Sequence, residues 1–409
     1  MNTAANSIQS RKLKYYCDIT SSKRIYASDY VEDGIPFVRG KEVVQRYKNP
    51  GSLSSELFIT RNKFETLRDK FGAPIEGDLL LTSVGTLGVP YYVKPEDEFY
   101  FKDGNLIWFR QFQELRSKFL YYWIQSPRGR AQLQKCTIGT SQSAYTIERL
   151  KEIELDDFAL CKQERIASIL SAYDDLIENN RRRIALLEQA ARLLYKEWFV
   201  HLRFPGHEHV KIKNGVPEGW ERTTVEDSAS FISRGITPSY DDEAKGLVIN
   251  QKCIRNHMVN LDLARHQSKQ APPDKLVRCG DVLVNSTGTG TLGRVAQFLF
   301  DIEDCTVDSH ITIIRPAPGV SACCLGSYFV EMESYIESMG RGATNQTELA
   351  RATLAEMKIL NPTKVLADQY DECLRPMQQQ MVNILRQNEQ LVQARDLLLP
   401  RLMNGEVAV

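Results

Sequence analysis

The sequence predicts an α+β protein, with two pseudo-repeated α/β modules separated by a long antiparallel two-helix coiled coil. Three observations lead to this fold class. Motifs of the first half recur in the second half, short apolar runs follow Gly-Asp pairs, and each half ends in a heptad pattern. A chain of 409 residues has room for two or three domains of ordinary size.

The repeat is carried by three pairs of motifs. GDLLLTSVGTLG at residues 77–88 resembles GDVLVNSTGTGTLG at 280–293, and GTSQSAYTIERL at 139–150 resembles GATNQTELARAT at 342–353. Both pairs have the same offset, 280 − 77 = 342 − 139 = 203. GIPFVRGK, which starts at Gly34, matches GLVINQKC, which starts at Gly246, at a slightly larger offset of 212. Because a common offset at separate places is hard to obtain by chance, the two halves share one plan.

Within each module, the pattern of apolar residues predicts both strands and helices. Short apolar runs at 79–81, 106–109, 282–284 and 311–314 are typical of buried strands. Longer segments predict helices, at 115–134 in the first module and 324–339 in the second.

Each half then ends in a long helix whose seam residues are spaced by alternating steps of four and three, a heptad pattern. The first seam comprises Ile166, Leu170, Tyr173, Ile177, Asn180, Ile184 and Leu187. The second comprises Met381, Ile384, Asn388, Leu391 and Leu398, with Arg395 at the position between the last two. Two such helices can bury both seams by pairing with each other, and the alternative is that each packs on its own module. Asn180 and Asn388 are expected to set the register, and Pro376 is expected to kink or interrupt the second helix.

Composition excludes several classes of protein. Lys plus Arg and Asp plus Glu are both 52, and 42% of the residues are hydrophobic, so the chain is neither disordered nor a uniformly basic nucleic-acid coat. The neutral total hides an asymmetry. Residues 1–155 carry 23 basic and 18 acidic side chains, and residues 218–360 carry 14 and 19. We find no run of 18 apolar residues and no apolar signal-peptide core, so no membrane partner is expected.

Nine cysteines without a CxxC pair indicate reduced thiols and a cytoplasmic location. His201, His207 and His209 form the one histidine cluster, but they lack a nearby cysteine or helical spacing, so no metal site is predicted.

No catalytic constellation is recognisable in the sequence. Motifs of methyltransferases, dinucleotide-binding folds, zinc proteases and serine hydrolases are missing. Residues 288–293 have the glycine spacing of a P-loop, but Arg294 and Val295 occupy the positions of its Lys and Ser/Thr. This segment is better interpreted as a Gly/Thr turn that faces a partner. The chain is therefore expected not to be an enzyme and to hold no cofactor, with an atypical nucleotide site as the alternative.

Polar loops recur at equivalent places in the two halves while their residues differ. Arg, Lys, Asn and Gln read base edges, and Ser and Thr serve phosphates or bases, so these loops are candidates for binding double-stranded DNA. The candidates in the first half are Arg39, Lys41, Ser83, Thr86, Gln142 and Tyr145. The candidates in the second half are Gln251, Lys252, Arg255, Ser286, Thr289, Arg341, Asn345 and Gln346. A two-fold framework with divergent loops suits a protein that reads two different half-sites.

Several strings resemble the specificity subunit of type I restriction–modification enzymes. The two Gly-Asp motifs and YTIERLKEI at 145–153 resemble segments of its target-recognition domains. QERIASIL at 163–170, LYKEWF at 194–199 and RFPGHE at 203–208 resemble its central conserved region. ARDLLLPRLMNGE at 394–406 resembles its C-terminal conserved region. The resemblance covers essentially the whole chain, although residues 366–380 match the first helical region poorly.

The resemblance implies a non-catalytic subunit in which each target-recognition domain binds half of a bipartite DNA site. The spacer helices would measure the gap between the half-sites. Partners would be two adenine-methylating subunits and two restriction/translocase subunits, which would carry S-adenosylmethionine, ATP and magnesium. Exposed helix residues Arg181, Arg182 and Arg183 are candidates for contact with the methyltransferase subunits.

The expected organisation has five segments. They are a first target-recognition domain (1–155), a central conserved helix (156–200), a linker (201–217), a second target-recognition domain (218–360) and a C-terminal conserved helix (361–409). Two alternatives stay open: a specificity subunit whose partner is a fused nuclease–methyltransferase, and a coiled-coil scaffold that binds only protein.

Overall fold

The computed structural model describes residues 10–48, 53, 55–139, 143–340, 348–407 and 409. The chain divides into two compact units. Unit 1 comprises Met1–Asn180 and Asn388–Val409, and unit 2 comprises Arg181–Gln387. No helix among the described residues is both long enough and apolar enough to span a membrane.

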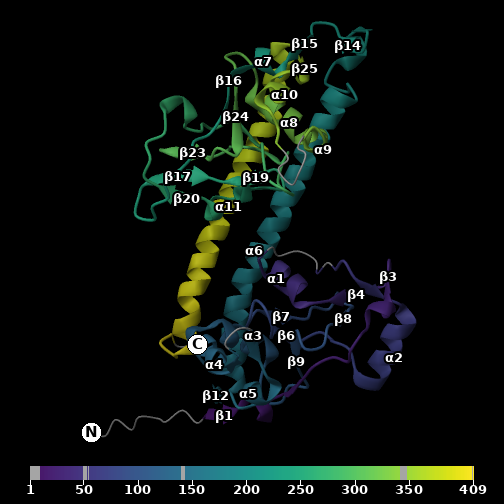
Figure 1. The fold of residues 1–409 in the computed structure, drawn as a ribbon, viewed down its shortest axis with the longest axis vertical. Coiled ribbons are helices and arrows are strands. Elements are labelled where there is room, and N and C mark those ends of the chain that lie inside the picture. Colours follow the sequence, from purple (N-terminus) through teal and green to yellow (C-terminus); the bar gives the residue numbers. More distant parts are fainter. Residues whose placement is uncertain (1–9, 49–52, 54, 140–142, 341–347, 408) are drawn as a thin grey trace. The chain divides into compact units, whose positions relative to one another are not determined.

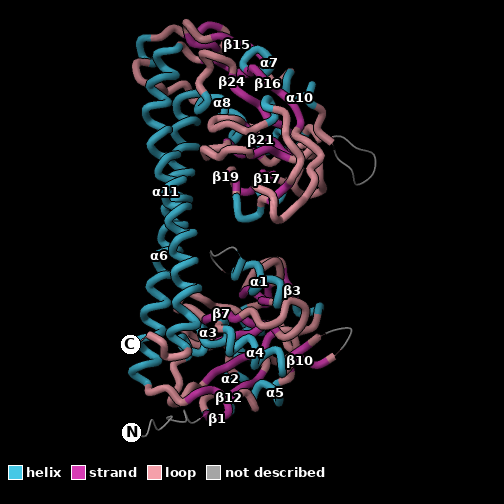
Figure 2. Tube along the Cα trace, turned by 90° about the vertical axis from the view of Figure 1, so that its left-hand side faces the viewer, coloured by secondary structure: helices cyan, strands magenta, loops and turns pink. Residues whose placement is uncertain are grey.

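Unit 1 is built around two four-stranded sheets (Figures 1 and 2). The first has the order β2 (Asp18–Thr20), β9 (Leu106–Arg110), β6 (Leu79–Thr82), β7 (Pro90–Tyr92), and all its pairs are antiparallel. The second has the order β3 (Tyr30–Val31), β5 (Phe58–Ile59), β4 (Ile35–Val38), β8 (Tyr100–Phe101), in which β4 and β8 are parallel. Two-stranded ribbons join β1 (Ser10–Lys12) to β12 (Glu154–Asp156) and β10 (Thr137–Ile138) to β11 (Ala144–Tyr145). The helices are α1 (Gly40–Lys48), α2 (Arg61–Phe71), α3 (Ser117–Gln125), α4 (Pro127–Lys135) and α5 (Ile147–Lys151).

Unit 2 repeats the first sheet in the same spatial order. Its strands are β16 (Ala229–Arg234), β24 (Ile311–Pro316), β21 (Val282–Asn285) and β22 (Val295–Gln297). A three-stranded sheet has the order β20 (Arg265–Gln267), β17 (Gly246–Ile249), β23 (Cys305–Val307), and β17 and β23 are parallel as β4 and β8 are. Two-stranded ribbons are β15 (Glu221–Thr224) with β25 (Lys358–Asn361), β18 (Ile254–Arg255) with β19 (Met258–Val259), and β13 (Ile212–Lys213) with β14 (Val216–Pro217). The shorter helices are α7 (Val225–Ser228), α8 (Ala322–Glu331), α9 (Glu333–Ser338) and α10 (Arg351–Ala355).

The Gly-Asp motif has the same structural role in both units. Gly77 and Gly280 have positive φ angles of 88° and 98°, which glycine adopts without strain. The next residue, Asp78 or Asp281, accepts a backbone N–H from three positions earlier, at 3.1 Å and 2.8 Å respectively. The motif therefore forms the turn that leads into the central strand, and it does so with side chains that are almost completely buried.

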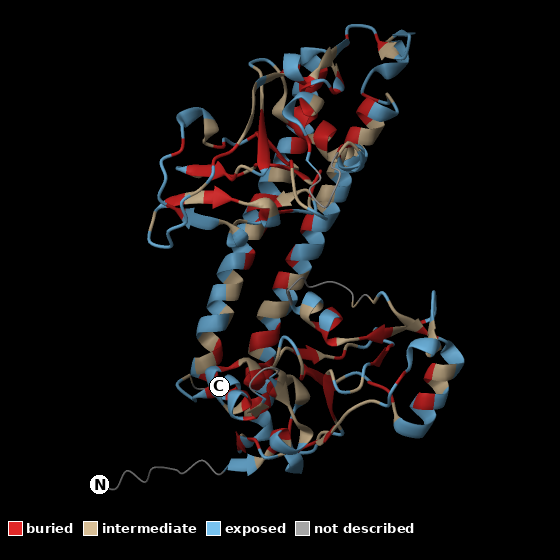
Figure 3. Ribbon diagram, in the orientation of Figure 1, coloured by how far each residue is buried: buried red, intermediate tan, exposed pale blue. Residues whose placement is uncertain are grey.

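All side chains of β6 and β21 are buried, as the apolar runs predict (Figure 3). The two segments predicted as single helices are each divided, and this part of the prediction was wrong. Ser126 separates α3 from α4 because its Oγ accepts the N–H of Gly129 at 3.1 Å and Pro127 starts the new helix. Met332 lies between α8 and α9.

The two long helices are α6 (Leu160–Tyr195), which continues as a π-helical turn (Lys196–Val200), and α11 (Lys364–Met403). In unit 1, Ile166 and Leu170 belong to the same hydrophobic cluster as Leu399 and Leu402. In unit 2, Ile184 clusters with Met381 and Ile384. Residues later on α6 thus cluster with residues earlier on α11. The two helices are therefore antiparallel within each unit (Figure 1).

The sequence predicted a kink or an interruption at Pro376, and the interruption does not occur, since α11 runs continuously past it. Proline removes one backbone hydrogen bond. The neighbouring side chains Tyr370, Leu374 and Met381 are buried on the same helix, and their packing offsets this loss.

Candidate nucleic-acid interface

Each unit carries a glycine-rich loop after its central strand, and the two loops are held by equivalent backbone bonds. The loop after β6 begins at Ser83, whose N–H donates to the carbonyl of Asn105 at 2.9 Å. The loop after β21 begins at Ser286, whose N–H donates to the carbonyl of His310 at 2.8 Å. The loops are thus the same element in two copies.

The last residue of each strand also closes its loop. Thr82 Oγ1 donates to the carbonyl of Thr86 at 2.6 Å, and Asn285 Nδ2 donates to the carbonyl of Thr291 at 3.1 Å. A third segment joins each site, because the N–H of Tyr145 bonds the carbonyl of Ser83 and that of Leu349 bonds the carbonyl of Ser286. Three segments far apart in sequence therefore meet at each loop.

The two serines predicted to contact DNA are inside the protein. Ser83 is 2% exposed and its Oγ donates to the carbonyl of Gly104 at 3.0 Å. Ser286 is fully buried, with its Oγ 2.6 Å from Thr312 Oγ1. In this conformation neither hydroxyl is presented to a partner, so their geometry fits a role in holding the loops.

Other predicted residues lie on the loop surfaces. Thr86 and Thr289 are exposed, and Tyr145 is half-buried beside Gly88. Burial raises the pKa of the Tyr145 phenol above its usual value. Lys252 and Arg255 are exposed in unit 2. Gln142, Arg341, Asn345 and Gln346 lie outside the described residues.

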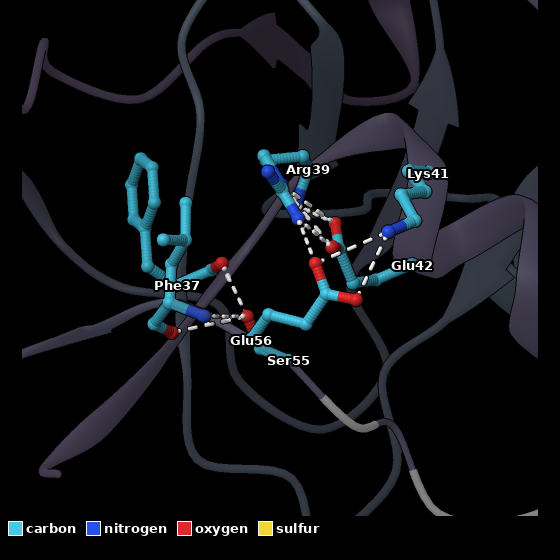
Figure 4. A network of polar contacts seen from close by, with 7 residues as sticks. Phe37, Arg39, Lys41, Glu42, Ser55 and Glu56 are labelled. Carbon is cyan, nitrogen blue, oxygen red and sulfur yellow. Dashed lines mark hydrogen bonds and ion pairs between the residues drawn. The ribbon is translucent and has the colours of Figure 1, made fainter. Parts of the chain in front are cut away.

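Arg39 and Lys41 are already paired with carboxylates (Figure 4). The Arg39 guanidinium bonds the buried carboxylate of Glu42, and its Nη2 also lies 3.3 Å from Glu56. Lys41 Nζ bonds both oxygens of Glu56 at 3.0 and 3.1 Å. The hydrogen bond from Lys41 holds the pKa of the Glu56 carboxyl below its usual value. The exposed Glu56 thus neutralises charge that a DNA phosphate would otherwise meet.

A surface hollow beside this network contains two cations that were not among the sequence candidates, Arg24 and Lys102. Its lining includes Arg24, Arg39, Lys102, Gly104 and Asn105. The hollow therefore touches the loop site directly, because the carbonyls of Gly104 and Asn105 hold Ser83. Arg24 and Lys102 lie about 80 positions apart in the sequence, so no single motif contains both of them.

In unit 2 the corresponding place holds a neutral polar network. Gln251 Nε2 lies 2.5 Å from the Thr287 carbonyl and 2.9 Å from Thr287 Oγ1. Thr287 Oγ1 in turn lies 2.7 Å from Nδ1 of the exposed His310. Arg294, which stands at the lysine position of a P-loop, donates to the Gly290 carbonyl at 2.7 Å and so stabilises the loop itself.

The remaining candidate residues lie on the long helices and in the linker. Most of the seam residues are buried, and Tyr173, Leu187, Leu391 and Leu398 are half-buried. Arg181, Arg182 and Arg183 are exposed on α6. His207 Nδ1 contacts the carbonyl of Phe204 at 2.8 Å, and no group of three potential metal ligands occurs in the part of the chain that the structure describes.

Two copies of one loop framework with different exposed side chains define a two-module protein. A family model described as the type I restriction modification DNA specificity domain matches residues 7–189. The MjaIX specificity subunit of a type I restriction enzyme from Methanocaldococcus jannaschii is 24% identical over 313 residues, which is 72% of this chain and 69% of the relative. The HindI specificity subunit from Haemophilus influenzae is 24% identical over 323 residues, which is 60% of this chain and 67% of the relative.

The fold agrees with these matches. The crystal structure of a type I restriction–modification S subunit from M. genitalium superposes with a TM-score of 0.60 and covers 98% of both chains, at 15% identity. Residues 7–189 thus match a DNA specificity domain of type I restriction–modification systems, and over most of its length the chain is similar to specificity subunits of such systems.

Proposed function

We propose that this chain is a specificity subunit and reads a bipartite DNA site, with one module for each half-site. Residues 1–155 and 218–360 would be the target-recognition domains, and residues 201–217 the linker. Residues 156–200 and 361–409 would be spacer helices that form an antiparallel coiled coil and fix the gap between the half-sites.

The observation that carries this proposal is the duplicated loop framework. Ser83 and Ser286 occupy the same backbone hydrogen bonds, whereas the side chains around them differ between the units. A shared framework gives each loop the same orientation within its own unit. Different side chains on the two loops would then select different bases. In this scheme Arg39, Lys41, Lys252 and Arg255 set the phosphate register, and Thr86, Tyr145, Gln251 and Thr289 lie near the bases, with Gln142, Arg341, Asn345 and Gln346 as further candidates.

Partners would dock on the helices. Two methyltransferase subunits would contact exposed α6 residues, including Arg181, Arg182 and Arg183, and two restriction subunits would join through them. S-adenosylmethionine, ATP and magnesium would be held by those partners, and the complex would act in the cytoplasm. Since the whole chain is neutral, much of the non-specific affinity for DNA would come from the partners.

A domain exchange tests the proposal. Residues 1–155 are replaced by the corresponding domain of another family member, and the sites methylated by the reconstituted complex are sequenced. One half of the recognised site should change, and the other half and the gap should stay. A reciprocal exchange of residues 218–360 should alter the opposite half. A change of both halves in either chimera would contradict the proposal that each module recognises one half-site. Methylation without sequence preference would contradict it as well.

A further inference from the structure

A chain of hydrogen bonds links Gln251, Thr287 and His310. The Thr287 carbonyl can only accept, so the Gln251 atom 2.5 Å from it must be the donating amide nitrogen. The same amide group donates to Thr287 Oγ1 at 2.9 Å. Thr287 Oγ1 lies 2.7 Å from Nδ1 of His310, and either atom can be the donor of this bond. When the Thr287 hydroxyl is the donor, donation runs from Gln251 through Thr287 to His310.

This direction determines which hydrogen bond His310 can offer to a partner. A ring that accepts at Nδ1 carries its hydrogen on Nε2, and a protonated ring also donates at Nε2. His310 is exposed, so in this arrangement its Nε2–H is a donor on an exposed side chain. The His310 backbone also holds Ser286 at the start of the glycine-rich loop, which fixes the position of the ring beside that loop.

We propose that His310 is a specificity-determining residue of the second module and selects a base edge that presents a hydrogen-bond acceptor. In the major groove such acceptors are guanine O6 and N7, adenine N7 and thymine O4, whereas the amino groups of cytosine and adenine only donate. Gln251 and Thr287 are positioning residues that act through His310. The inference rests on the proposed function, because it assumes that this loop faces DNA.

The test is selection of randomised duplexes by the complex of this chain with its modification subunits, followed by sequencing. The wild-type complex should show one position, in one half-site, where an acceptor-bearing base is preferred. His310→Ala should lower that preference by roughly five- to tenfold, the size expected for one neutral hydrogen bond. His310→Gln, whose amide nitrogen can stand where Nε2 stood, should retain most of it. Thr287→Val should relax the same position, and Thr287→Ser should restore it.

His266→Ala is the matched control, because His266 is an exposed histidine on β20 of the same unit. It should leave every base preference unchanged. All variants should keep the wild-type midpoint of thermal unfolding and the wild-type affinity for non-specific duplex DNA. These two controls distinguish a role in base selection from a structural role. If the wild-type complex selects a site and His310→Ala changes the preference at no position, the role of His310 is refuted while the proposed function stands. A wild-type complex that selects no sequence would overturn the proposed function.

Discussion

Asn180 Nδ2 donates a hydrogen bond to Oδ1 of Asn388 over 3.0 Å, and the two residues are only 7% and 8% exposed. This bond joins α6 to α11 at a buried position of the helix pair. The buried side-chain amides of the two asparagines can hydrogen-bond to each other only when they face each other. The pair therefore specifies one axial register of the two helices.

Replacing one partner should cost more than replacing both. Asn388→Ala leaves the Asn180 amide buried without its partner, which should lower the free energy of unfolding by roughly 1–3 kcal/mol. The double change of Asn180 and Asn388 to Leu should be nearly neutral or stabilising, with the register less well defined. Denaturant unfolding measures both effects. Asn179→Ala, at the exposed neighbouring position, is the control, and equal losses in Asn388→Ala and Asn179→Ala would contradict the register role.

The Gly-Asp motif of unit 2 should matter for stability. Arg315 bonds Asp281 through Nε at 2.9 Å and Nη2 at 2.7 Å, and the side chains are 11% and 1% exposed. Asp281→Ala leaves this guanidinium buried without a counter-charge, which should cost roughly 3–5 kcal/mol. The midpoint of thermal unfolding should fall accordingly. Asp242→Ala, at an exposed position of the same unit, should leave the midpoint almost unchanged, and a similarly mild Asp281→Ala would refute the structural assignment.

His257 makes the stability of unit 2 depend on pH. Hydrogen bonds to Glu188 at 2.6 Å and Glu333 at 3.4 Å raise the pKa of His257 from 6.5 to about 9. A raised pKa means that the folded state binds the proton more tightly. The stabilisation is therefore complete below about pH 6.5 and is lost as the pH rises through about 9, and it amounts to about 3 kcal/mol.

This pH dependence is measured as the difference in unfolding free energy between wild type and His257→Gln. The difference should be about 3 kcal/mol near pH 6 and should shrink towards about pH 10. His266→Gln, at an exposed position, should follow the wild-type curve at every pH. A wild type and His257→Gln pair with parallel curves would show that the two carboxylates do not stabilise the protonated ring.

The sequence was sufficient for the plan of the fold because that plan depends on local patterns. The apolar runs at 79–81 and 282–284 predicted buried strands, and the heptad spacing of Ile166 through Leu187 predicted the buried face of α6. Division of the helix at Ser126 was also readable, since Ser-Pro is a signal for a new helix start. The continuity of α11 through Pro376 could not be predicted, because it depends on how the side chains around Pro376 pack against residues that are distant in sequence.

The loop site was only partly predictable for a related reason. A serine after a strand can point inward or outward, and the sequence does not tell which, so the burial of Ser83 and Ser286 could not be predicted. Asn105 and His310 were missed although the repeat contained the signal. Each residue directly precedes an apolar strand, β9 or β24, and the two positions differ by 205, close to the common offset.

Glu56 should restrain DNA binding by the first module, because it occupies Lys41 and reaches Arg39. Glu56→Gln removes the negative charge and frees Lys41, while Arg39 stays paired with Glu42 and loses only its second carboxylate. Affinity for duplex DNA should therefore rise for all sequences, and the dependence on salt should steepen by roughly one phosphate contact or more. Titration of the complex with a fluorescent duplex at several salt concentrations measures both changes. Glu98→Gln, which breaks the exposed pair with Arg61 at 2.9 Å in the same unit, is the matched control for net charge. Equal gains in Glu56→Gln and Glu98→Gln would attribute the effect to overall charge, whereas a gain confined to Glu56→Gln would place phosphate binding at Arg39 and Lys41.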